Sequence, residues 1–153
     1  MFNTIDNDKP FGLVEVYERN SVDQTWVRRG EGIPGYAAGD SFGSSVALSS
    51  NGNITVSSGR FNDENGINSG KVQVYIFDED AGNSGSWSQH GVDIVGNKDD
   101  LAGAVVAISS DGDVVAVGFP GNADRTGLVR VYMFNNNAWI PRGILSEKLP
   151  TTV

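Results

Sequence analysis

The sequence predicts an all-β protein built from repeated four-stranded antiparallel sheets. One observation is that SVALSSNGNITVS (residues 45–57) nearly recurs as VVAISSDGDVVAV (105–117). A second is that glycine and tryptophan stand at matching places in each copy. A third is that the apolar runs are short, rich in β-branched residues, and bounded by Asn-Gly or Asp-Gly. Short strands in a repeat with glycine and aromatic landmarks are typical of β-propeller blades.

Composition supports this fold class and excludes several functions. The 153 residues include 20 Gly and are 39% hydrophobic, which disfavours long buried helices. A formal charge of −8 argues against a nucleic-acid backbone or an anionic membrane surface as the main partner. Cysteine is absent and His90 is the only histidine, which excludes disulfides, thiolate metal sites and multi-histidine metal sites.

The repeat contains three phrases that keep their order. The hairpin phrase is followed by GKVQVYIF (70–77) in one copy and GLVRVYMF (127–134) in the next, and GLVEVYER (12–19) precedes both. After each of these, a Trp is followed by a Gly: Trp26 with Gly30, Trp87 with Gly91, and Trp139 with Gly143. The positions that we interpret as structural landmarks of the two full copies are Gly43, Gly52, Gly70, Trp87, Gly91, Gly103, Gly112, Gly127, Trp139 and Gly143.

Each full copy is expected to form four strands. The first two make a hairpin at Asn51-Gly52 or Asp111-Gly112, for which we predict type I′ turns with positive φ at both central residues. The third strand alternates strictly, with Val72, Val74 and Ile76 on one face. A loop of variable length then leads to a fourth strand, which carries the Trp.

These phrases resemble FG-GAP repeats, the blades of integrin-alpha-like β-propellers. Phe42-Gly43 matches the FG element, where the second copy has Ala102-Gly103. Gly118-Phe119-Pro120 is similar to the GAP element, where the first copy has Ser58-Gly59-Arg60. The resemblance covers residues 11–145 and implies a propeller that binds other proteins, as adhesion and scaffold propellers do. It also favours a secreted, cell-surface or luminal location, although no signal peptide is recognisable in this chain.

The family often binds calcium in the loop between the first two strands, and this chain departs from that pattern. Calcium takes six to eight oxygen ligands. The loop at Asn51 has no carboxylate, and the loop at Asp111 and Asp113 has two. Asp63, in an oxygen-rich loop, lies outside the family's metal position. We therefore expect no metal or cofactor requirement, with Asp111, Asp113 and Asp63 as the calcium candidates that remain.

No catalytic cluster is recognisable in the sequence. Arg29 and Arg142 stand at the repeat position of His90, which suggests a polar strand edge more than a general base. A carbohydrate pocket is the alternative: Tyr36, Phe42 and the loops at 62–68 and 78–86 offer aromatic and polar side chains. The three Trp occupy one repeat position, which favours packing between neighbouring blades.

The strand count predicts an incomplete propeller. Phe2-Asn3 and the stretch up to Gly12 resemble the loop before a third strand, so the chain is expected to supply a half-blade (about 12–30) and two blades (about 42–94 and 102–143). Propellers need at least four blades, and an open half-blade presents an unpaired edge and apolar faces. We therefore expect a non-enzymatic interaction or scaffold module that is not a stable free monomer, covered by a protein partner or by further blades. A lectin-like propeller and, less favoured, an enzyme are the alternatives.

Overall fold

The computed structural model describes residues 11–82 and 84–142, and these residues form β-strands with a single helical turn. The strands are β1 (Leu13–Val14), β2 (Tyr17–Arg19), β3 (Trp26–Arg28), β4 (Ile33–Pro34), β5 (Ser45–Leu48), β6 (Ile54–Gly59), β7 (Lys71–Asp78), β8 (Ser86–Gln89), β9 (Ile94–Val95), β10 (Val106–Ile108), β11 (Val114–Phe119), β12 (Leu128–Asn135) and β13 (Ala138–Pro141). The helical turn is α1 (Asn122–Arg125). The prediction of an all-β protein is confirmed.

All strand pairs within the sheets are antiparallel, and the two four-stranded runs follow chain order. Strands β10 to β13 form a four-stranded sheet in chain order. Strands β5 to β8 do the same, and β9 adds to β7 beyond the end of β8. The short strands β1 to β4 form two separate pairs, β1 with β4 and β2 with β3.

The GLVEVY phrase at residues 12–17 forms two short strands, β1 and β2, whereas each later copy of the phrase lies in one continuous strand, β7 or β12. β7 pairs with β9 through Lys71 and Val72 and with β8 from Tyr75 onward. In the first copy, the pair β1–β4 corresponds to β7–β9 and the pair β2–β3 corresponds to β7–β8. The break between β1 and β2 falls at Glu15 and Val16. The fourth strand that we expected in each copy is thus split in the first two copies. The division of the chain into a half-blade and two blades stays a prediction.

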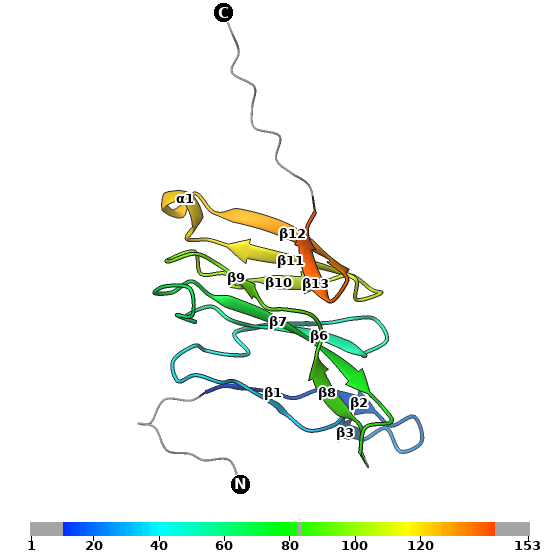
Figure 1. The fold of residues 1–153 in the computed structure, drawn as a ribbon. Helices are drawn as coiled ribbons and strands as arrows, with labels where there is room; N and C mark the ends of the chain where they lie inside the picture. Colours follow the sequence, from blue (N-terminus) through cyan, green and yellow to red (C-terminus); the bar gives the residue numbers. More distant parts are fainter. Residues whose placement is uncertain (1–10, 83, 143–153) are drawn as a thin grey trace, which may run out of the picture.

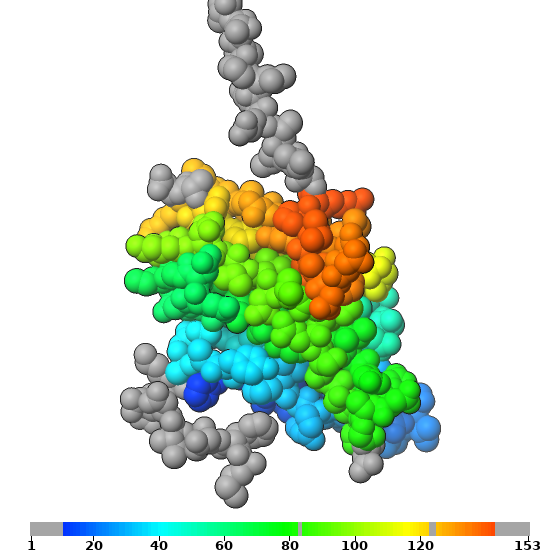
Figure 2. Space-filling model, in the orientation of Figure 1, coloured from blue at the N-terminus to red at the C-terminus, as the bar shows by residue number. Residues whose placement is uncertain are grey.

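The sheets are stacked in chain order, as the blue, green and yellow-to-orange bands of Figures 1 and 2 show. Most of the core lies between the β5–β9 sheet and the β10–β13 sheet, where Val56, Val72 and Val74 meet Val115 and Val117. A smaller cluster joins the first strands to the β5–β9 sheet and consists of Val14, Ile33, Phe42 and Tyr75.

The two predicted hairpins form, but the predicted type I′ turns are wrong. Positive φ occurs at Gly52 (72°) and Gly112 (87°), but at neither Asn51 nor Asp111. The loops are longer than two residues because β5 ends at Leu48 and β6 begins at Ile54. Inside the first loop, the Ser49 hydroxyl donates to Asn51 Oδ1 and accepts the Ile54 N–H, which widens the turn. Ser109 does the same in the second loop.

Candidate functional site

A pair of valines in the repeated GLVEVY phrase marks the face that each sheet presents to the next one. Val72 and Val74 are 0% and 2% exposed, because the β10–β13 sheet covers them. Val14 is likewise buried, at 7% exposed, against residues of the second copy. Val129 occupies the same position in the third copy and is 71% exposed. The same side chain is thus covered in two copies and uncovered in the last.

The face of the β10–β13 sheet around Val129 is mostly apolar, and we call it the outer face. Register places its members opposite one another: Ala107, Ala116 and Val131 form one row, and Val114, Met133 and Ile140 form another. Four of its large side chains are exposed: Val105, Val129, Met133 and Ile140. An exposed apolar patch of contiguous side chains marks an interaction site more often than it marks an ordinary protein surface.

Two tryptophans of the repeat make the same hydrogen bond to the preceding copy. Trp87 Nε1 donates to the Arg29 carbonyl oxygen at 2.8 Å, and Trp139 Nε1 donates to the His90 carbonyl oxygen at 2.9 Å. Arg29 and His90 occupy the same repeat position. Trp26, the first of the three, is exposed. Burying an indole requires a partner for its N–H, and here the partner is a backbone carbonyl of the neighbouring sheet.

The side chains of Arg29 and His90 also link neighbouring sheets. The Arg29 guanidinium lies 4.4 Å from the centroid of the Phe77 ring, and His90 stacks on Phe134 with centroids 3.9 Å apart. Burial against that ring lowers the pKa of His90. In this setting His90 is a packing residue of the seam between two sheets, and a general-base role has no support from its surroundings.

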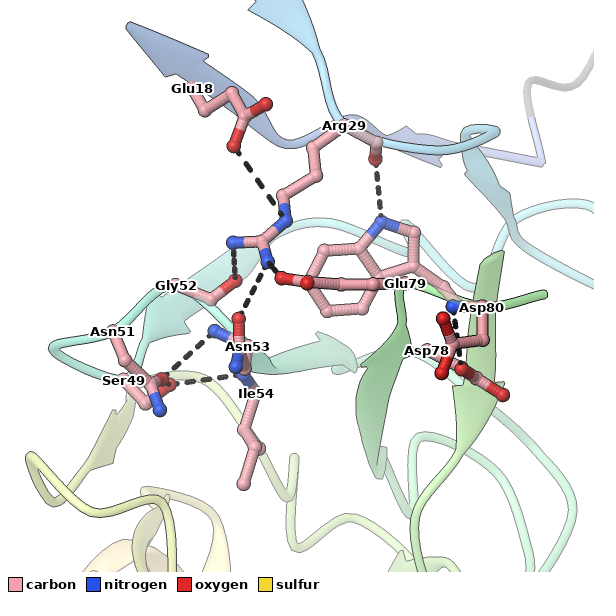
Figure 3. A network of polar contacts seen from close by, with 11 residues as sticks. Glu18, Arg29, Ser49, Asn51, Gly52, Asn53, Ile54, Asp78, Glu79 and Asp80 are labelled. Atoms are coloured by element: carbon pink, nitrogen blue, oxygen red, sulfur yellow. Dashed lines mark hydrogen bonds and ion pairs between the residues drawn. The ribbon is translucent and has the colours of Figure 1, made fainter. Parts of the chain in front are cut away.

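Arg29 is in addition the centre of a polar network between the first strands and the β5–β9 sheet (Figure 3). Its guanidinium donates to the Gly52 carbonyl oxygen, to Asn53 Oδ1 at 2.7 Å and to Glu79 at 2.8 Å. The Arg29 side chain is only 12% exposed, and its bonds to Gly52 and Asn53 are partly buried, whereas Glu79 is 72% exposed. Sequence reasoning did not identify this network, because it joins residues from three separate segments of the chain.

The calcium candidates are not brought together. Asp111 and Asp113 lie in the β10–β11 loop, whereas Asp63 lies in the β6–β7 loop at the opposite end of the sheets. The Asp111 carboxylate accepts the Ser109 hydroxyl, which lowers its pKa, and Asp63 accepts the Asn68 N–H. Within residues 11–82 and 84–142, no three acidic or histidine side chains are grouped so as to hold a metal ion.

The carbohydrate candidates are partly brought together. Tyr36, Phe42, Asn62 and Asp63 line one cavity of about 420 Å³, which lies between the segment that connects β4 to β5 and the β6–β7 part of the β5–β9 sheet. The loop at 78–86 does not line it. The cavity also includes Gly59, Lys71 and Gln73, which sequence reasoning missed. In the sequence, the difference between the copies at this place is Gly59, which has the repeat position of Phe119.

Three of the sequence-based assignments fall on residues that the structure does not describe. Phe2, Asn3 and Gly143 lie outside 11–82 and 84–142. Across the described part of the chain, no helix has the length and hydropathy needed to span a membrane.

A stack of antiparallel sheets joined by the same valine, tryptophan and stacking contacts defines an all-β repeat protein. Residues 34–75, which extend from the end of β4 into β7, match the family model of the FG-GAP repeat. The resemblance to FG-GAP repeats is therefore confirmed for this part of the chain, which includes Phe42-Gly43. No curated protein matches the chain.

Proposed function

We propose that this chain is a segment of a β-propeller and acts as a non-enzymatic interaction module, whose outer face binds a further sheet of the same repeat. The FG-GAP match and the stacking of the sheets in chain order support the propeller, because both are properties of blade repeats. The histidine packed in a seam between two sheets supports a binding role over a catalytic one.

The observation that carries the proposal is the contrast between Val72 and Val129. Both follow the repeat glycine by two residues, at Gly70 and Gly127, yet one is fully buried and the other is largely exposed. Burying an apolar side chain of this size contributes about 1.5–3 kcal/mol. The outer face holds several such side chains, so covering it with a suitable surface stabilises the covered state.

The neighbouring seam indicates which kind of surface fits. Val72 and Val74 are covered by Val115, Val117 and Phe119, all from one antiparallel sheet. A sheet of the same repeat would bring equivalent apolar side chains onto Val129 and Val131. It would also bring a tryptophan within reach of the backbone carbonyl of Arg142, the repeat counterpart of Arg29 and His90.

Light scattering on the full chain tests the proposal. We expect association that increases with protein concentration, because an uncovered outer face binds whatever equivalent surface is present. Val129→Glu should abolish the association without lowering the melting temperature, since Val129 is already exposed. Ile67→Glu is the matched control: Ile67 is also an exposed apolar residue, but it lies in the β6–β7 loop.

Two results contradict the proposal. One is a chain that stays a monodisperse monomer at every concentration and unfolds cooperatively. The other is equal loss of association in Val129→Glu and Ile67→Glu, which would mean that the contact is non-specific.

A further inference from the structure

Strands β1 and β2 have a neighbouring strand on one side only among the described residues, because β1 pairs with β4 and β2 pairs with β3. Their counterpart β7 has strands on both sides, with β8 and β9 along one edge and β6 along the other. At the end of β7, the Phe77 N–H donates to the Asn53 carbonyl oxygen, just before β6, at 2.8 Å. Arg19 has the repeat position of Phe77, so residues 13–19 form the edge to which a strand like β6 would bond.

The direction of the backbone groups confirms which edge is open. The carbonyl oxygens of Gly12 and Val16 accept N–H groups from the ends of β4 and β3. Successive residues of a strand direct their backbone groups to opposite edges. The N–H groups of Leu13, Glu15 and Tyr17 therefore point away from β3 and β4, toward the open edge.

One face of β5 is exposed where the same face of β10 is covered. Val106 and Ile108 pack in the main core, and Val106 is only 7% exposed. Their repeat counterparts, Val46 and Leu48, are 53% and 46% exposed. Ala47 points to the main core, so the two residues beside it point the other way, toward the first strands. This face of β5 is apolar and lacks the cover that β10 has.

The cover of β10 is the β5–β6 hairpin of the preceding copy, since β10 contacts both of these strands. A Cβ at Gly112, in the loop after β10, would collide with Ile54 of β6. A Cβ at the corresponding Gly52 would meet the Arg29 side chain instead. One hairpin thus does two things in this seam: β6 pairs with β7, and the hairpin lies against β10.

Serines of the β5–β6 hairpin add polar contacts to this cover. The Ser45 hydroxyl accepts the Val106 N–H at 3.0 Å, and the Ser58 hydroxyl donates to the Gly103 carbonyl oxygen at 2.6 Å. The Val46 N–H is the repeat counterpart of the Val106 N–H. A hairpin with serine at the position of Ser45 would therefore find a donor at the same place on β5.

The open edge of residues 13–19 and the exposed face of β5 are the two surfaces that a single hairpin covers in the next seam. We propose that they bind a β-hairpin of another FG-GAP repeat, whose second strand pairs with β1 and β2 while the hairpin covers Val46 and Leu48. The face of this hairpin toward β5 carries small and apolar side chains, as Ala47 and Val56 do in the next seam. The inference rests on the proposed propeller, and it is independent of the outer face, which belongs to the last sheet.

Amide hydrogen exchange of the full chain, followed by NMR, tests the inference with a synthetic peptide of residues 42–60 as the probe. We expect the amides of Leu13, Glu15 and Tyr17 to exchange rapidly in the free chain and to be protected at saturating peptide. The same protection is expected in Val129→Glu, because the outer face takes no part. Protection without association through Val129 would contradict only the proposed outer face, and association without protection would contradict only the hairpin site.

Two variants test the specificity of the site. A peptide with Ile54→Lys and Val56→Lys should give no protection, because its face toward β5 is charged. In the chain, Val46→Glu should weaken peptide binding about tenfold without lowering the melting temperature, since Val46 is more than half exposed. Val92→Glu is the matched control: Val92 is 56% exposed but lies in the β8–β9 loop, and its substitution should leave binding unchanged.

Three results overturn the proposal. The first is that the peptide protects none of the amides of Leu13, Glu15 and Tyr17 at any concentration. The second is equal protection by the peptide with two lysines, and the third is equal affinity of Val46→Glu and Val92→Glu for the unaltered peptide.

Discussion

Substitution of Gly70 and Gly127 tests how tightly neighbouring sheets are packed, by comparing the free energies of unfolding of the two variants. Both stand directly before the third strand of a copy, and both have positive φ, 74° and 76°. A Cβ at Gly70 would collide with the backbone nitrogen and oxygen of Ala102, which forms a bridge with Gly70 across the seam. A Cβ at Gly127 would meet nothing closer than Pro120, at 3.9 Å. The two glycines therefore share the same backbone constraint and differ in the presence of a neighbouring sheet.

The expected costs follow from these two situations. Gly127→Ala should lower the free energy of unfolding by about 1–2 kcal/mol, the strain of an alanine in the left-handed region. Gly70→Ala should lose the same amount plus about 1–3 kcal/mol for overpacking against a backbone that cannot move aside. Urea unfolding of both variants measures the difference, with the midpoint compared at unchanged slope.

Equal destabilisation in the two variants would refute the reasoning, because it would mean that the seam adjusts to a methyl group or is not packed in solution. The pair also bears on the proposed interaction. If a further sheet of the same repeat covers the outer face, Gly127 faces that sheet as Gly70 faces Ala102. Gly127→Ala should then weaken association more than its effect on the stability of the chain accounts for.

Three other predictions concern a turn, a titration and a metal. Gly112→Val should lower the free energy of unfolding by about 1–2 kcal/mol in urea, because a β-branched residue resists positive φ and its Cβ would collide with Ile54. Burial lowers the pKa of His90, so its contribution to stability is present above the unfolded pKa of about 6.5 and is lost as pH falls below that value, levelling off beneath the folded pKa. A proton NMR titration of this only histidine measures the shift, and His90→Phe should remove that part of the pH dependence. A calcium chelator should change the melting temperature by no more than about a degree or two, and a drop of several degrees would redirect attention to Asp111, Asp113 and Asp63.

The features that sequence could predict are those set by local patterns. Strict alternation in residues 71–76 placed a strand there, and the repeated Asn-Gly and Asp-Gly marked both hairpins. The turn type was wrong because the deciding groups are the hydroxyls of Ser49 and Ser109, which bond across the loop and lengthen it. The prediction of a type I′ turn from Asn-Gly or Asp-Gly takes no account of the serine two residues earlier.

The cavity and the Arg29 network depend on how distant segments of the chain pack together, and a local sequence pattern does not specify that packing. Gly59 appears in the sequence as an ordinary departure from the GAP element. Only the stacked sheets show that the Asp40 backbone packs against it, since a Cβ at Gly59 would lie 3.1 Å from the Asp40 carbonyl oxygen. Comparison of aligned positions between copies would have found Gly59 against Phe119, and it is the one sequence signal that leads to the site.

The two end surfaces of the stack of sheets differ, and each corresponds to one side of the contact between neighbouring sheets. The last sheet exposes Val129, the position that is covered in the inner seam. At the other end, Leu13, Tyr17 and Trp26 are exposed, and their counterparts Lys71, Tyr75 and Trp87 face the preceding sheet. The proposed contact is therefore heterologous, with one end fitting the opposite end of the next unit. Such a contact closes a ring when its rotation permits, which is how blades make a propeller, and it does not pair two identical faces.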